Sequence, residues 1–104
     1  MTTARAGSGA PPAPTSTEPF DPTARYGLDP QVALRPEPFG ALAYHYGSRR
    51  LTFLRSPLLA QVVRDLENHS SADSALQASV PGAERPAFRR ALAALADSRF
   101  IRAI

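Results

Sequence analysis

The sequence contains no cysteine and no tryptophan, and all of its basic residues are arginine because lysine is also absent. Without cysteine the chain has no disulfide, no thiolate nucleophile and no cysteine-ligated iron–sulfur cluster or zinc ion. No run approaches the about 18 consecutive apolar residues that a membrane span needs. Apart from Met1, the first 19 residues contain no large apolar side chain, so no secretory signal is recognisable. These absences predict a cytoplasmic protein that has no membrane contact.

Proline divides the chain of 104 residues into two parts. Six of the eleven prolines lie within residues 1–30, among glycine, serine, threonine and alanine. Such a segment buries too little apolar surface to offset the entropy lost on ordering it. We therefore predict a disordered proline-rich tail over residues 1–24 and a folded domain over residues 25–104. Tyr26 and Leu28 are expected to attach the first residues of that domain to the rest.

The first half of the domain has the pattern of short strands. Residues 31–34, 41–46 and 49–54 are predicted strands, and the prolines at 36 and 38 end the first of them and keep it from the centre of a sheet. Gly47-Ser48 suits a two-residue type II′ turn. A turn centred there pairs Tyr44 with Leu51 and Leu42 with Phe53, so the four side chains share one face.

The second half of the domain has helical signals. Ser56-Pro57 reads as an N-cap followed by proline at the first helical position, and Leu58, Val62 and Leu66 recur at helical spacing. Further helices are predicted over residues 72–78 and 86–98, with an apolar tail after them. The order predicts an α+β, winged-helix-like fold, in which a three-stranded antiparallel sheet is followed by three helices.

Residues that could carry catalysis are scattered. His45 and His69 are the only histidines, and neither has a partner at the spacing of metal ligands. The acidic residues form no pair suited to general acid–base chemistry. We expect no catalytic residue, no metal, no cofactor and no enzyme activity.

The basic charge suggests nucleic acid, but the net charge is only +3 and the arginines are dispersed. A winged-helix DNA-binding protein is the alternative function. The last predicted helix opposes it, because residues 91–96 contain only alanine and leucine and thus no side chain that reads bases. We therefore expect no nucleic acid. A scaffold of the same fold with another protein partner stays open.

The third predicted strand offers a binding surface. At the edge of a sheet its free N–H and C=O groups can accept an extended peptide as an added strand. The small residues of the last helix would leave room beside it for the peptide's side chains. The simpler alternative is that these alanines pack directly against the sheet, with no groove.

Residues 30–54, which run from Pro30 to Leu54, resemble the N-terminal signature of the mycofactocin biosynthesis chaperone. The segment Val62-Val63-Arg64-Asp65-Leu66 and the alanine- and leucine-rich last helix are also similar, so the resemblance covers residues 28–104. This family is related to the pyrroloquinoline quinone peptide chaperone. Its members are peptide-recognition elements of modified-peptide pathways. The resemblance implies a non-catalytic protein that binds the leader of a precursor peptide and presents it to a radical S-adenosylmethionine maturase.

The resemblance also implies where the peptide binds. In related domains the leader lies beside the third strand and against the third helix. Carried over to this sequence, the strand positions are Arg50, Leu51, Thr52, Phe53, Leu54 and Arg55. The helix positions are Arg89, Leu92, Ala93, Ala96 and Arg99.

Overall fold

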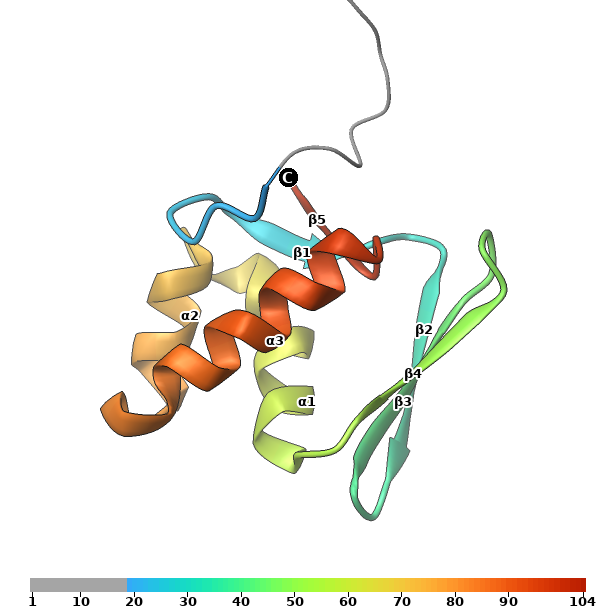
Figure 1. Ribbon diagram of the computed structural model, residues 1–104, viewed down its shortest axis with the longest axis horizontal. Helices are drawn as coiled ribbons and strands as arrows, with labels where there is room; N and C mark the ends of the chain where they lie inside the picture. Colours follow the sequence, from blue (N-terminus) through green and yellow to red (C-terminus); the bar gives the residue numbers. More distant parts are fainter. Residues whose placement is uncertain (1–18) are drawn as a thin grey trace, which may run out of the picture.

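The computed structural model describes residues 19–104, which form two small antiparallel sheets and three α-helices (Figure 1). The larger sheet has the order β2 (Val32–Glu37), β3 (Gly40–His45), β4 (Arg50–Leu54). The smaller sheet pairs β1 (Tyr26–Leu28) with β5 (Ile101–Ala103). The helical elements are α1 (Pro57–Asp65), η2 (Leu66–Asn68), α2 (Ala72–Ser79), η3 (Gly82–Glu84) and α3 (Arg85–Asp97), where η marks a 3₁₀ turn. This arrangement confirms the predicted α+β fold, in which a three-stranded antiparallel sheet precedes three helices.

The pairing of β3 with β4 follows the predicted register. Tyr44 lies opposite Leu51, and Leu42 lies opposite Phe53. The apolar alternation of the two strands was sufficient to select this pairing, since a slip of one residue would move every side chain to the other face.

The predicted type II′ turn at Gly47-Ser48 is wrong. The strands end at His45 and Arg50, so the connection has four residues, and Arg49 rather than Gly47 takes a positive φ of 60°. Two bonds stabilise this wider loop. The Arg49 N–H donates to the His45 carbonyl at 2.8 Å, and the Ser48 N–H donates to His45 Nδ1 at 3.2 Å.

The first strand of the sheet is longer than predicted. β2 continues through Arg35, Pro36 and Glu37, residues that were expected to end it. β2 is an edge strand, as the prolines predicted, and an edge strand tolerates proline where the missing N–H would point away from its partner.

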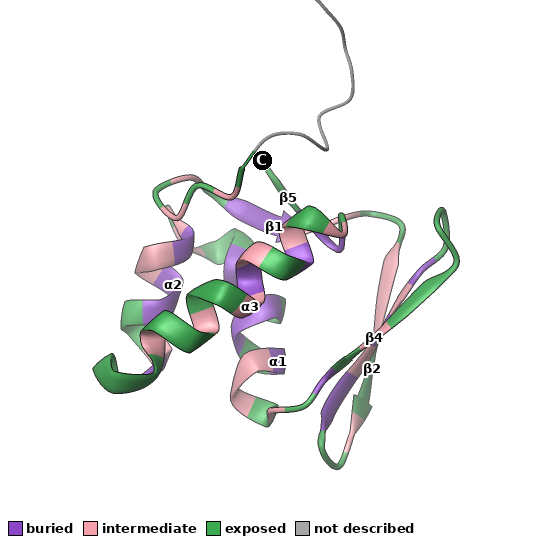
Figure 2. Ribbon diagram, viewed as in Figure 1, coloured by how far each residue is buried: buried purple, intermediate pink, exposed green. Residues whose placement is uncertain are grey.

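Helix α1 packs against the inner face of the three-stranded sheet. Ala41, Ala43 and Leu54 are buried there, and α1 contacts both β3 and β4. The larger buried side chains lie among the helices and the β1–β5 pair (Figure 2). They are Val62, Val63, Leu66, Leu76, Leu92 and Ile101. Alanine on the inner face allows α1 to approach the sheet closely, and the large apolar residues of the strands therefore point outward.

Residues 20–24 contact the domain at the start of α2. The N–H groups of Ala72 and Asp73 donate to the carbonyls of Ala24 and Pro22, both at 2.9 Å. These bonds satisfy two donors that have no partner within the first turn of a helix. The part of the predicted tail that covers residues 1–18 lies outside the described residues, so the division of the chain near residue 25 stays a prediction.

Asp21 orders the turn that precedes β1. The Thr23 hydroxyl and the Thr23 N–H donate to Asp21 Oδ1 at 2.7 and 2.9 Å. These two hydrogen bonds favour the ionised carboxylate and lower the pKa of Asp21 below its ordinary value. Next to this turn, the Phe20 and Tyr26 rings lie 5.0 Å apart between centroids.

None of the helices within residues 19–104 has the length and apolar character that crossing a bilayer would require.

Gly40 begins β3 in a conformation that other residues rarely adopt. Its φ is 145°, and a Cβ there would overlap the Leu54 carbonyl oxygen. We expect Gly40→Ala to lower the free energy of unfolding by about 2–4 kcal/mol, because both the backbone and its neighbour would be strained. Urea denaturation monitored by circular dichroism measures this loss.

Gly82 provides the matched control. The nearest atom to a Cβ at that position is Arg85 Nη1 at 3.8 Å. Gly82→Ala should therefore stay within about 0.5 kcal/mol of the unmodified protein. Equal stabilities of the two variants would contradict the strain assigned to Gly40.

Candidate functional site

The two edges of the three-stranded sheet can be told apart by the direction of their main-chain groups. The Tyr46 N–H donates to the Gln31 carbonyl at 2.8 Å, directly beyond the pair formed by Val32 and His45. In an antiparallel ladder, hydrogen-bonded pairs recur at every second position. Tyr44 and Leu42 therefore direct their N–H and C=O groups toward β2, and the residues between them direct theirs toward β4.

This alternation fixes which residues of β4 have free main-chain groups. Arg50, Thr52 and Leu54 lie opposite His45, Ala43 and Ala41, and they bond to β3. Leu51 and Phe53 direct their N–H and C=O groups away from β3. No strand lies on that side of β4 within residues 19–104. These two residues give β4 an open edge.

The opposite edge, on β2, is less open. The residues of β2 that direct main-chain groups outward are Val32, Leu34 and Pro36. The Val32 N–H is already bonded to the Asp29 carbonyl at 2.9 Å, and Pro36 has no N–H. Proline on an edge strand hinders the addition of another strand. β4 is therefore the edge that is better suited to accept an extended segment.

The side chains of β4 alternate between an exposed and a covered face. The side chains of Leu51 and Phe53 are 59% and 53% exposed, Thr52 is half-buried and Leu54 is buried. The Arg55 guanidinium carbon lies 5.2 Å from the centroid of the Phe53 ring, on the outer face of the sheet. The strand positions predicted from the sequence thus form one edge, although the Leu54 side chain belongs to the core.

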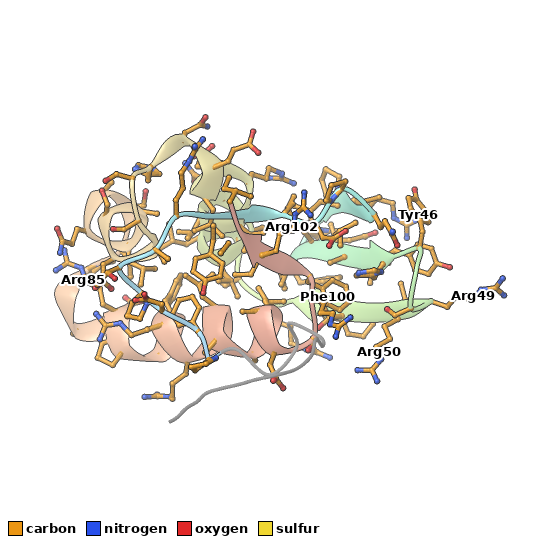
Figure 3. The ribbon with its side chains drawn as sticks, turned by 90° about the horizontal axis from the view of Figure 1, so that it is seen from above. Tyr46, Arg49, Arg50, Arg85, Phe100 and Arg102 are labelled. Carbon is orange, nitrogen blue, oxygen red and sulfur yellow. The ribbon has the colours of Figure 1, made fainter. Side chains whose placement is uncertain are left out.

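The predicted peptide-binding positions on and after α3 differ in their burial and in their partners. Leu92 is buried in the core, whereas Ala93 and Ala96 are half-buried. Arg89 is paired with Asp73, with Nη2 2.8 Å from Oδ1. Arg99 follows the helix with a φ of 66° and is exposed. Seen from above, α3 lies on the same side of the molecule as β4 (Figure 3). The peptide-binding role of these residues stays a prediction.

Three exposed residues in the loops of the three-stranded sheet were not singled out from the sequence. The Phe39 ring contacts Phe53 edge-to-face, with centroids 5.8 Å apart, and Tyr46 contacts Tyr44 in the same way at 5.1 Å. The Arg49 side chain extends from the far end of the sheet (Figure 3). Phe39 lies in the connection between β2 and β3, where strand alternation gives no signal, and Tyr46, predicted as the last residue of a strand, lies in the loop after β3.

The arginines around β4 form no ion pair with an acidic side chain within residues 19–104. The sequence has no acidic residue between Glu37 and Asp65, although this stretch contains four arginines. The ion pairs within residues 19–104 are Arg35–Glu37 and Arg89–Asp73, so none of them involves Arg49, Arg50 or Arg55. The same described residues contain no group of three histidine, cysteine, aspartate or glutamate side chains that could hold a metal ion. The site therefore offers main-chain groups, apolar side chains and positive charge.

The sequence matches a known protein family. The profile of the peptide chaperone MftB family matches residues 25–102. The chain belongs to this family. Proteins named "Peptide chaperone MftB" are 45% identical to it in Mycobacterium ulcerans, 43% in Mycolicibacterium smegmatis and 42% in Mycobacterium tuberculosis. Each alignment covers 79% of this chain, together with 76%, 81% and 76% of the respective relative. No solved structure matches the chain.

Membership confirms the resemblance to the mycofactocin chaperones and gives the protein a peptide chaperone role. All three relatives carry the name of a chaperone, and none carries the name of an enzyme. The open edge of β4 lies within the matched residues.

The assignment of the open edge predicts an alternating pattern of amide exchange. In the free protein, the Leu51 and Phe53 amides should exchange with deuterium at least about tenfold faster than the Thr52 and Leu54 amides, because only the latter two are bonded to β3. Exchange followed by NMR on the full chain measures each amide separately. Equal protection of Leu51 and Thr52 would contradict the assignment.

Proposed function

We propose that the protein binds the leader of the mycofactocin precursor peptide as a strand added to β4 and presents it to a radical S-adenosylmethionine maturase. The peptide chaperone family supports a peptide ligand. The observation that carries the binding mode is the pair of free main-chain positions at Leu51 and Phe53, which faces no other strand within residues 19–104.

Main-chain bonding would provide a general affinity for extended peptide. Leu51 and Phe53 each offer one donor and one acceptor, at the spacing that an added strand requires. Each such bond contributes only about 0.5–1.5 kcal/mol net, because the free groups are already bonded to water. Side-chain contacts must therefore provide much of the selectivity.

Charge would bring the peptide to this edge. Arg50 and Arg55 lie at the two ends of β4 and are exposed, and Arg99 is exposed on the α3 side. Such charges attract an acidic leader and accelerate its association. They also make the association rate fall with increasing salt.

The arginines of α3 do not favour the DNA-binding alternative, because two of them are engaged within the protein. The Arg85 Nε donates to the Val80 carbonyl at 2.9 Å, and Arg89 is paired with Asp73. Both guanidinium groups are thus engaged within the protein, which leaves Arg90 as the third arginine of α3. A helix that contacts many phosphates needs more free positive charge than this.

Substitutions at Phe53 test the strand addition. We expect Phe53→Ala to weaken binding of the synthetic precursor leader moderately, because it removes the ring and keeps the N–H. Phe53→Pro also removes the outward N–H and should weaken binding about tenfold more than alanine does, since proline obstructs pairing on an edge strand. Isothermal titration calorimetry with the full chain measures both constants.

The choice of position 53 keeps the hairpin intact. The Thr52 N–H points toward β3, so proline at that position would break the sheet itself. Leu34→Pro, compared with Leu34→Ala, is the control, because Leu34 directs its N–H outward on β2 and both variants lose the same core-packed side chain. The two Leu34 variants should bind the leader equally well. If Phe53→Pro binds the leader as well as Phe53→Ala does, strand addition at β4 is wrong.

A further inference from the structure

The residues of β4 with free main-chain groups are also those with exposed apolar side chains. Leu51 and Phe53 lie on the outer face of the sheet, which no helix covers within residues 19–104. Residues that lie directly opposite each other in neighbouring strands have their side chains on the same face. A residue that pairs with Leu51 or Phe53 therefore places its own side chain beside theirs.

An arginine stands at each end of this apolar pair. Leu51 and Phe53 are flanked by Arg49, which is exposed in the loop directly before β4, and by Arg55, whose guanidinium carbon lies 5.2 Å from the centroid of the Phe53 ring. We call these four residues the outer row. Its two arginines take part in no ion pair within residues 19–104. The outer row thus has positive charge at both ends and an exposed apolar centre.

The same charges disfavour a second copy of the chain as the occupant. An antiparallel pairing of two β4 strands about Thr52 would place Leu51 opposite Phe53 of the other copy. It would also bring the Arg49 of each copy next to the Arg55 of the other, two residues further along the outer row. Like charges opposite each other destabilise a strand pair. An acidic strand meets no such repulsion.

We propose that the outer row selects the sequence of the added strand, an inference that rests on the proposed function. The preferred segment has large apolar residues at positions i and i+2 and carboxylates at positions i−2 and i+4. The apolar pair lies beside Phe53 and Leu51, and the carboxylates reach Arg55 and Arg49. The pattern reads the same in both chain directions, so it holds for antiparallel and for parallel addition.

Two synthetic peptides of identical composition test this selection. The first has valine at i and i+2, glutamate at i−2 and i+4, and threonine elsewhere, and it carries a fluorescein label. The second has its two valines adjacent, which places one of them on the other face of the strand. We expect the full chain to bind the first peptide about tenfold more tightly in fluorescence anisotropy, since two cross-strand apolar contacts replace one.

Substitutions in the outer row and outside it complete the test. Leu51→Thr combined with Phe53→Thr keeps residues that favour strands and should abolish the preference for the first peptide. Tyr46→Thr is the control, because Tyr46 is 59% exposed, as Leu51 is, but lies in the loop outside β4. Arg55→Glu, a change at an exposed position, should reverse the preference between glutamate and lysine at the peptide position beside Arg55. That position is i−2 in antiparallel addition and i+4 in parallel addition.

The outcomes separate this inference from the proposed function. Equal binding of the two peptides, or a preference that survives the double substitution, overturns the selection by the outer row and leaves strand addition in place. Failure of both peptides and of the precursor leader to bind overturns the proposed function as well. A dimer in analytical ultracentrifugation that the double substitution dissociates would instead identify a second copy as the occupant.

Discussion

The close approach of α1 to the inner face of the sheet determines much else in this molecule. Ala41 and Ala43 are buried there because their small side chains let the helix lie near the strands. Since side chains alternate along a strand, the large residues Leu51 and Phe53 must point outward. The same alternation directs their main-chain groups away from β3. The packing of α1 on the inner face therefore leaves both the apolar side chains and the unpaired main-chain groups of β4 exposed.

An exposed edge with apolar side chains is normally an aggregation hazard, and the two edges of this sheet deal with it differently. Pro36 leaves β2 without an N–H at an outward position, and the Arg35–Glu37 ion pair adds charge to that strand. β4 has no proline, and arginines flank it instead. Arginines repel a second copy of the same strand and attract a strand that carries carboxylates. These charges therefore disfavour pairing of β4 with the β4 of a second copy and favour pairing with an acidic strand.

The sequence predicted the elements that depend on local patterns. The alternation of residues 41–54 gave the correct register of the hairpin, and Ser56-Pro57 gave the start of α1, where the Ser56 hydroxyl accepts from the Leu59 N–H at 3.1 Å. It did not give the four-residue loop, because the bonds that stabilise it come from the His45 side chain and carbonyl. The pairing of β1 with β5 was also missed, since the two strands are three residues long and lie at opposite ends of the domain. The sequence also did not show which predicted helix positions are occupied within the protein. Leu92 belongs to the core and Arg89 pairs with Asp73, and both depend on how α3 packs.

In the proposed strand addition, the leader peptide pairs with β4 through the main chain of Leu51 and Phe53. NMR on the isotope-labelled full chain with unlabelled precursor leader tests it most directly, because amide protons and α-protons of paired strands lie close enough for nuclear Overhauser effects. Strand addition predicts intermolecular effects between the leader backbone and the amide protons of Leu51 and Phe53. Intermolecular effects confined to the helices or to β2, with none to these two residues, would contradict it.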